Sequence, residues 1–148
     1  MHIPTDEKQF RFWVMRRDGN PNITIANLLG ISRQAVSRAL LSVDKKIVSA
    51  LEDMAHANQI SIEKVNPERG VLIGRSIPFQ TRAIIFISQK HGMQVWYEHE
   101  GDCNSCPRYT ECIELLWDYA GELGIIIEKT EDPTKMADEL FKKLLEAL

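Results

Sequence analysis

The feature that most constrains the fold is an apolar stripe in residues 33–57. Its members recur at steps of three and four residues: Val36, Leu40, Val43, Ile47, Leu51 and Met54. This spacing places them on one face of a single long helix. Ser32 stands just before that helix and offers a side-chain oxygen to the free backbone amides of the first turn. Because the stripe is long for one small domain, we expect it to end in a helix–helix contact.

The pattern changes after residue 59, where short segments rich in Ile and Val replace the helical spacing. They are ISIEKVN, GVLIGRSI, RAIIFIS and MQVWYEH, separated by the turn sequences PERG, PFQT and QKHG, and they predict four strands. A helix is expected next in YTECIELLWDYAGEL, and GIIIEK at 124–129 is a candidate fifth strand. Asp132 and Pro133 suit the cap and first position of a final helix. The apolar face of that helix is expected to hold Met136, Leu140, Phe141, Leu144 and Leu148.

The stretch NITIANLLGISRQAVSRALL has the spacing of a helix-turn-helix. Ala26 is small where two helices must cross closely. Gly30, four residues later, can take the positive-φ conformation that a tight turn between helices requires. The small core between the helices is expected to contain Ile25, Leu29, Ile31 and Val36. This arrangement leaves the amino-terminal part of the second helix facing outward.

That outward part carries side chains suited to reading DNA. Arg33 and Arg38 can bond bidentately to guanine, and Gln34 can do so to adenine. Ser37 can contact either a base edge or a phosphate. Contacts to the phosphate backbone position a protein without reading sequence. The candidates for that role are Thr24, Arg16 and Arg17.

The segment TIANLLGISRQAVSRALLSVDKKI resembles the helix-turn-helix of bacterial and archaeal transcription regulators. It is most similar to the kind in sigma-factor region 4 and in archaeal Tfx-type regulators, where a GIS-x-x-x-V core leads into a long recognition helix. The resemblance implies a sequence-specific DNA-binding regulator and implies base-reading positions at Arg33, Gln34, Ser37 and Arg38. The alternative is a plain helical hairpin that packs on another part of the protein and never touches nucleic acid.

The fold class expected from these segments is α+β in two parts. Residues 1–58 are predicted as a helix-turn-helix DNA-binding domain with a long recognition and linker helix, and residues 59–148 as a small α+β sensor or dimerisation domain with about four to five strands and two helices. Residues 1–60 contain eight Lys/Arg against six Asp/Glu, whereas the remainder contains ten against fifteen. A mildly basic part joined to an acidic part indicates separate roles.

A single short reading helix gives limited affinity, and two half-sites one helical turn apart reinforce each other. The expected partners are therefore double-stranded DNA and a second copy of the chain, in a homodimer. No apolar run approaches the ~20 residues needed to cross a bilayer, and MHIPTDEKQF does not resemble a secretory signal. We expect a cytoplasmic protein with no membrane partner.

All three cysteines of the chain lie within ten residues, in GDCNSCPRYTEC. In a reducing compartment, clustered thiols in odd number favour metal ligands or redox groups over a disulfide framework. Cys103 and Cys106 have the spacing with which a tight turn presents two thiolates to one metal, and Cys112 adds a third. His99 is the nearest candidate for a fourth ligand. Weaker candidates are His91 and Asp102.

Two metal groups fit this spacing equally well. Zn²⁺ would join the last strand to the following helix and stabilise the second domain. The C-x2-C-x5-C spacing also resembles the cluster loop of some DNA-repair glycosylases, although the fourth cysteine of those proteins is missing here. That resemblance implies a [4Fe–4S] cluster suited to redox sensing. The alternatives are a redox dithiol in a small electron carrier, or a zinc-stapled adaptor for another protein. We find no phosphate-binding glycine loop, nucleophile elbow or catalytic triad and expect no enzyme activity.

Overall fold

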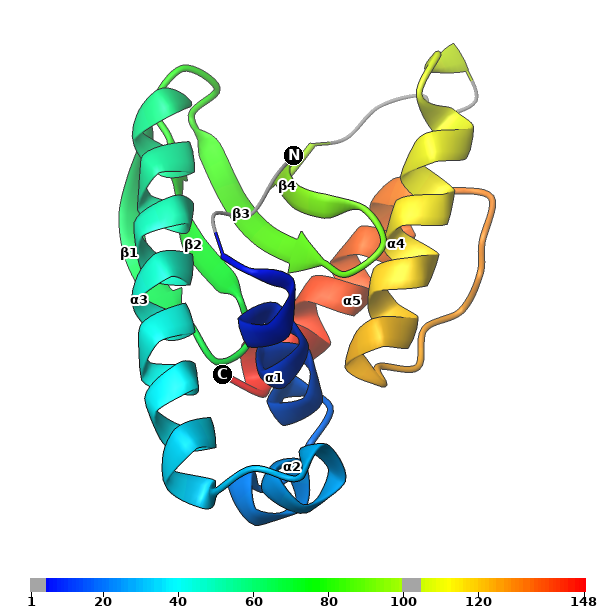
Figure 1. Ribbon diagram of the computed structural model, residues 1–148. Coiled ribbons are helices and arrows are strands. Elements are labelled where there is room, and N and C mark those ends of the chain that lie inside the picture. Colours follow the sequence, from blue (N-terminus) through cyan, green and yellow to red (C-terminus); the bar gives the residue numbers. More distant parts are fainter. Residues whose placement is uncertain (1–4, 100–104) are drawn as a thin grey trace.

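The computed structural model describes residues 5–99 and 105–148, and Figure 1 shows the arrangement of its helices and strands. The elements in chain order are α1 (Glu7–Arg17), α2 (Asn22–Leu29), α3 (Arg33–Ala57), β1 (Ile60–Asn66), β2 (Val71–Ser76), β3 (Thr81–Ser88), β4 (Gly92–Tyr97), α4 (Tyr109–Leu123) and α5 (Pro133–Glu146). The four strands form one antiparallel sheet in the order β1-β2-β3-β4, so each strand pairs with its neighbour in sequence. The α+β class is therefore confirmed.

The sheet lies between two layers of helices (Figure 1). One face packs against α1 and α3, and the other packs against α4 and α5. Strand β3 shows why the sheet takes this form, because its residues from Ala83 to Ser88 are all buried. Alternate residues point to opposite faces: Ile85 and Ile87 contact the α3 side, whereas Ile84 and Phe86 contact the α4–α5 side. A continuous apolar strand is typical of a sheet covered on both faces.

The apolar stripe of α3 is buried within the chain, whereas we expected it to end in a helix–helix contact. Five of its six members are 0–4% exposed, and Met54 is partly buried. They share one apolar core with α1 and with sheet residues such as Leu72, Ile85 and Met93. The sheet therefore covers the stripe within the chain. The helical part and the strands are joined by this common core, and the division at residue 58 stays a prediction.

The segment 124–129 was expected as a candidate fifth strand and is not one. Its polar backbone groups are bonded to helices instead: the Ile125 N–H donates to the carbonyl of Ala120 at 2.9 Å, and the Glu128 N–H donates to Glu139 Oε1 at 2.7 Å. Lys143 Nζ donates to the carbonyl of Ile126 at 2.6 Å. The segment thus lies along the helical layer, away from the hydrogen-bonding edges of the sheet.

The final helix begins as the sequence predicted. Asp132 is the N-cap and accepts a hydrogen bond from the Thr134 N–H at 3.0 Å, and Pro133 occupies the first helical position. Met136, Leu140 and Leu144 are 0–1% exposed because they pack on the sheet. None of the helices in the described ranges has the length and apolar character that spanning a membrane requires.

Candidate functional site

The turn between α2 and α3 has the geometry that the sequence predicted. Ala26 is buried where the helices meet, and its carbonyl accepts a hydrogen bond from the Ile31 N–H at 3.1 Å. Gly30 takes a left-handed conformation with φ 66°. Ser32 then caps α3, because its Oγ accepts the N–H of Ala35 at 3.0 Å. The small core that we predicted between the two helices is confirmed: Ile25 and Val36 are buried, and Leu29 and Ile31 pack against the same core.

The amino-terminal end of α3 extends past the sheet (Figure 1). The helix has 25 residues, which corresponds to about 37 Å. The strands have six to eight residues, which corresponds to about 20–26 Å. The carboxyl end of α3 is held at the sheet because β1 begins three residues after Ala57. The excess length therefore appears at the other end, where α2 and the first turns of α3 form a lobe.

The side chains at this projecting end are exposed. Arg33, Gln34 and Arg38 all reach solvent, and none of them makes an ion pair or hydrogen bond with any described residue. Gln34 and Arg38 are four residues apart and share the face opposite the buried stripe. Steps of three and four extend this face to Leu41, which is 64% exposed, and to Lys45. The sequence interpretation omitted these two residues, although their spacing from Arg38 was a usable signal.

Two further predicted contact residues lie at the border of the exposed face. Ser37 is half-buried, and its Oγ accepts a hydrogen bond from Asn22 Nδ2 at 3.1 Å. This bond fixes α2 against α3 and leaves the Ser37 hydroxyl able to donate. Thr24 is half-buried on α2. The structure thus brings Ser37 and Thr24 near the projecting end without exposing them fully.

The Arg16 side chain is bonded within the protein, so it is not free to bind a DNA phosphate group. Its Nη1 and Nη2 donate to the two carboxylate oxygens of Asp44 at 3.0 Å and 2.6 Å. The two side chains are only 19% and 21% exposed. A bidentate pair of this kind fixes geometry as well as charge. Arg16 therefore holds α1 to α3, and we withdraw it from the phosphate-binding set.

Arg17 is buried even more deeply, with 1% of its side chain exposed. Its Nη1 donates to the carbonyl of Ile87 at 2.6 Å, Nη2 donates to Glu122 Oε1 at 3.3 Å, and its guanidinium carbon lies 4.6 Å from the Trp13 ring centre. Desolvation lowers the pKa of Arg17, and nearby Tyr119 and Glu122 oppose that shift. Arg17 links α1, the end of β3 and α4, so it too is withdrawn from the phosphate-binding set.

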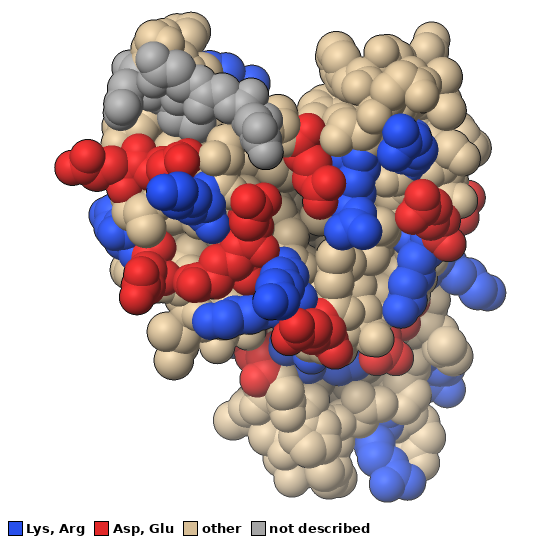
Figure 2. Space-filling view, turned by 180° about the vertical axis from the view of Figure 1, so that it is seen from behind, with Lys and Arg blue, Asp and Glu red and all other residues tan. Residues whose placement is uncertain are grey.

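The distribution of charge agrees with the position of the projecting lobe. Residues 19–46 contain four Lys/Arg and a single carboxylate, Asp44, which Arg16 neutralises. In the rear view of Figure 2, the lowest part of the molecule shows basic side chains and little acidic surface. The part that holds α4 and α5 carries most of the acidic side chains in that view. The projecting end therefore repels a polyanion such as DNA less than the acidic α4–α5 part does.

The cysteine segment leads from β4 to α4. Cys106 is exposed and Cys112 is half-buried in the first turns of α4, where its N–H donates to the carbonyl of Arg108 at 2.9 Å. Cys103 lies outside the described residues. His99 is exposed; its Nδ1 lies 2.7 Å from the carbonyl oxygen of Tyr97, and its ring lies 5.3 Å from that of Trp96.

Within the described ranges, no three His, Cys, Asp or Glu side chains are grouped as a metal site. The predicted set includes Cys103, so it cannot be assembled from these ranges alone. His91, the weaker candidate, is bonded elsewhere: its Nε2 lies 2.8 Å from Asp118 Oδ2. Cys106 is exposed just before α4, whereas Cys112 is partly buried against the apolar core of the α4–α5 side.

Comparison of the chain with protein-family models, with curated proteins and with solved structures finds no match.

Proposed function

We propose that the protein is a sequence-specific, double-stranded-DNA-binding transcription regulator that uses the first turns of α3 as its recognition helix. The observation that carries this proposal is the exposed and unpaired state of Arg33, Gln34 and Arg38 on a helix end that extends past the sheet. By contrast, Arg16 and Arg17 on α1 are engaged in contacts inside the fold. Arg11, the remaining arginine of the helical part, is also exposed. The contrast between the two engaged arginines and the exposed side chains at the start of α3 supports a role in binding for Arg33, Gln34 and Arg38.

The dimensions of the projecting lobe suit the major groove of DNA. That groove is about 12 Å wide, and a helix with its side chains is about 10–12 Å across. Gln34 and Arg38 on one face would read bases, because each can make a bidentate contact to a purine edge. Lys45 is seven residues beyond Arg38 on the same face and would meet the phosphate backbone. Leu41 between them would contact a thymine methyl group.

Selection from a random duplex library is the direct test, because it requires no knowledge of the operator. We expect the full chain to enrich a defined sequence. Arg38→Ala should then weaken binding to that sequence about 10–100-fold, since a bidentate base contact contributes about 1–3 kcal/mol. Arg75→Ala is the matched control, because Arg75 is an exposed arginine on β2 outside the helical part. Equal affinity of both variants, or no enriched sequence, would refute the proposal.

The salt dependence of binding separates base contacts from phosphate contacts. Lys45→Ala should weaken binding to all duplexes alike and reduce the slope of log K against log salt by about 1. Arg38→Ala should chiefly reduce the preference for the selected sequence. A Lys45→Ala variant that alters sequence preference and leaves the slope unchanged would reverse these assignments.

We also propose that two copies of the chain bind a two-fold operator. Because the stripe of α3 is covered inside each chain, the contact between copies must use other surfaces. Sedimentation of the protein with and without the selected duplex tests this. A stoichiometry of two chains per duplex is expected, and one chain per duplex at saturation would refute the dimer.

The cysteine segment is proposed to hold Zn²⁺ or a [4Fe–4S] cluster through Cys103, Cys106, Cys112 and His99. Such a group would join the end of β4 to the start of α4 and contribute stability or redox sensitivity. Purification without oxygen, followed by metal analysis and a visible spectrum, distinguishes the two. Stoichiometric zinc in a colourless sample indicates the first, and a brown sample with iron and sulfide indicates the second. A protein with neither would refute the centre.

A further inference from the structure

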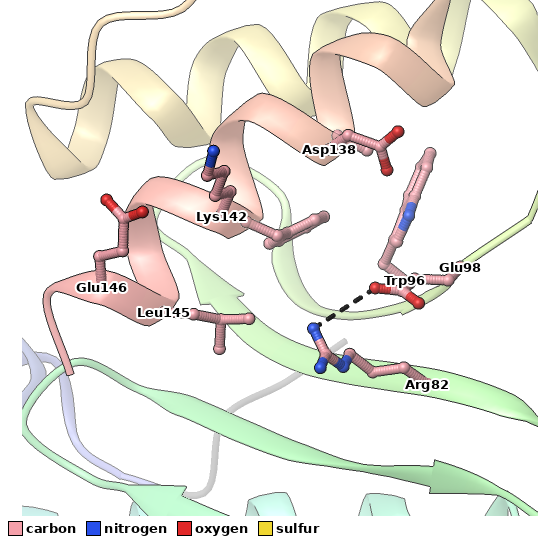
Figure 3. Close-up of a pocket in the computed structure, with 9 residues that line it drawn as sticks. Arg82, Trp96, Glu98, Asp138, Lys142, Leu145 and Glu146 are labelled. Carbon is pink, nitrogen blue, oxygen red and sulfur yellow. Dashed lines mark ion pairs between the residues drawn. The ribbon is translucent and has the colours of Figure 1, made fainter.

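A cavity of about 360 Å³ opens between the α5 layer and the ends of β3 and β4 (Figure 3). This size lies in the range of pockets that take small molecules. Its walls come from two separate segments of the sequence, 82–98 and 137–146. They are lined by Arg82, Trp96, Glu98, Ala137, Asp138, Phe141, Lys142, Leu145 and Glu146.

The floor of the cavity is apolar. Trp96 and Phe141 lie side by side, with ring centres 6.2 Å apart, and each is more than 90% buried. Leu145 is one turn along α5 from Phe141, and its side chain is partly buried. These groups offer a surface for an aliphatic or aromatic group of limited size, because only their edges remain accessible.

The sheet side of the cavity carries a loosely paired arginine. Arg82 Nη1 lies 3.5 Å from Glu98 Oε1, and the side chains are 46% and 48% exposed. Arg75 is directly opposite Arg82 in the antiparallel register, so two like charges share this part of the sheet. Figure 3 shows the Arg82 guanidinium directed toward the cavity beside Glu98. A single long contact leaves both groups able to accept a new partner.

The helix side of the cavity carries a second carboxylate. Asp138 is exposed on α5 and forms no ion pair or hydrogen bond with any described residue. Lys142 and Glu146 follow it at steps of four along the same rim. In Figure 3 the Asp138 carboxylate lies beside the Trp96 side chain, across the cavity from Arg82. The opening therefore presents cations and carboxylates together around an apolar floor: Arg82 and Lys142 are the cations, and Glu98, Asp138 and Glu146 are the carboxylates.

The geometry points to a binding site for a small zwitterion with an apolar side chain, the chemistry of an α-amino acid. Its carboxylate would pair with Arg82, its ammonium group with Glu98 or Asp138, and its side chain would pack on Phe141 and Leu145. A simple carboxylic acid would place its charge against Glu98, and a simple amine would place its charge against Arg82. The site is separate from the recognition helix, and this inference does not rest on the proposed DNA binding.

Calorimetric titration of the full chain tests the charge requirement with three ligands of matched side chain. L-leucine has both charges, 4-methylpentanoate lacks the ammonium group, and 3-methylbutylamine lacks the carboxylate. We expect L-leucine to bind and each of the other two to bind about tenfold more weakly or not at all, because a hydrogen bond to a charged group is lost. No binding of L-leucine, or equal binding of either singly charged ligand, would overturn the inference.

Substitution of the cavity residues locates the site. Arg82→Gln and Asp138→Asn should each reduce L-leucine affinity about tenfold. Arg75→Gln is the matched control, because it removes a neighbouring arginine on the same face of the sheet that does not line the cavity. Both arginine variants should retain the urea midpoint of the wild type, since both side chains are exposed. Retained L-leucine affinity in Arg82→Gln, or an equal loss in Arg75→Gln, would place binding elsewhere.

Discussion

The two helical layers cover the same sheet in different ways. On one face, α3 is about 37 Å long and extends beyond strands of about 20–26 Å. On the other face, α4 and α5 have 15 and 14 residues, about 21–22 Å, and match the strands in length. The first layer therefore has a free end, and the second layer has none.

The difference in length separates two kinds of surface. The free end of α3 presents exposed polar side chains on a rigid helix that the sheet holds from behind. The α4–α5 layer instead leaves an opening at its border with the sheet, where Arg82 and Asp138 face each other across the cavity. We propose that the first surface enters a groove of DNA and that the second receives a small molecule. Four predictions test how far the two layers differ.

The largest effect is expected where α3 lies against the sheet. Leu51 is fully buried there, and Leu51→Ala should lower the free energy of unfolding by about 3 kcal/mol through lost burial and the cavity left behind. Urea denaturation measures this. Leu41→Ala on the same helix is the control, because Leu41 is 64% exposed and its loss should cost less than about 0.5 kcal/mol. Similar losses in the two variants would show that the stripe is not covered by the sheet.

The second-largest loss of stability is expected where α4 is connected to α1, at the ion pair of Glu122 and Arg17. Glu122 on α4 accepts hydrogen bonds from Arg17, from Ser88 Oγ and from the backbone N–H of Gln89. Glu122→Ala would leave the buried guanidinium of Arg17 without its carboxylate, and we expect a loss of about 2–3 kcal/mol.

The control for the Arg17–Glu122 pair is an exposed ion pair at the start of α4. Glu111 pairs with Arg108 at 3.4 Å, and both side chains are more than 70% exposed. Glu111→Ala should therefore change the free energy of unfolding by less than about 0.5 kcal/mol. If Glu122→Ala were equally mild, Arg17 would not depend on α4 for its charge partner.

Two glycines should respond to alanine with opposite signs. Gly30 in the turn before α3 has φ 66°, where a side chain is strained, and Gly30→Ala should lower the free energy of unfolding by about 1 kcal/mol. Gly121 lies within α4, and apart from the adjacent helix backbone no atom lies within 4 Å of the place that an added Cβ would occupy, so Gly121→Ala should raise that free energy by about 0.5–1 kcal/mol. Thermal denaturation of both variants gives the comparison. A stabilised Gly30→Ala would contradict the left-handed turn.

Local sequence rules predicted the elements and their ends well. The Ser32 and Asp132 caps, the turn at Gly30 and the stripe of α3 each depend on residues a few positions apart, so the chain reveals them directly. The covering of the stripe was not predictable in the same way. An apolar face with this spacing packs equally well on a partner helix or on a sheet, and only the assembled strands decide between them.

The partners of Arg16 and Arg17 are a second feature that the sequence did not predict. Arg16 and Arg17 have the same chemistry and are adjacent in sequence. A turn of about 100° per residue along α1 nevertheless directs Arg16 toward Asp44, and Arg17 toward the end of β3 and Glu122. Their partners are 28 and 105 residues away. The cavity beside Arg82 and Asp138 likewise has no local signature, because it exists only where β3, β4 and α5 meet.

The smallest effect on stability is expected at a partly exposed cluster where Asp118 of α4 meets the turn between β3 and β4. Asp118 Oδ2 lies 2.8 Å from His91 Nε2 and 3.2 Å from Lys90 Nζ. The hydrogen bond with His91, aided by Lys90, lowers the pKa of Asp118 below its ordinary value. A carboxylate with a lowered pKa in the folded state contributes stability above its unfolded pKa of about 3.9, and this contribution is lost as the pH falls through the folded pKa.

Asp118→Asn should therefore lower the free energy of unfolding by about 0.5 kcal/mol at neutral pH, as expected for a partly exposed pair. The difference from the wild type should shrink as the pH falls toward the folded pKa, because the wild-type carboxyl then becomes protonated and loses the same attraction. Urea midpoints across an acid series measure this convergence. Asp53→Asn on α3, at an exposed residue outside this cluster, is the control variant. A deficit in Asp118→Asn that is equally large at every pH would mean that Asp118 acts through its shape and not through its charge.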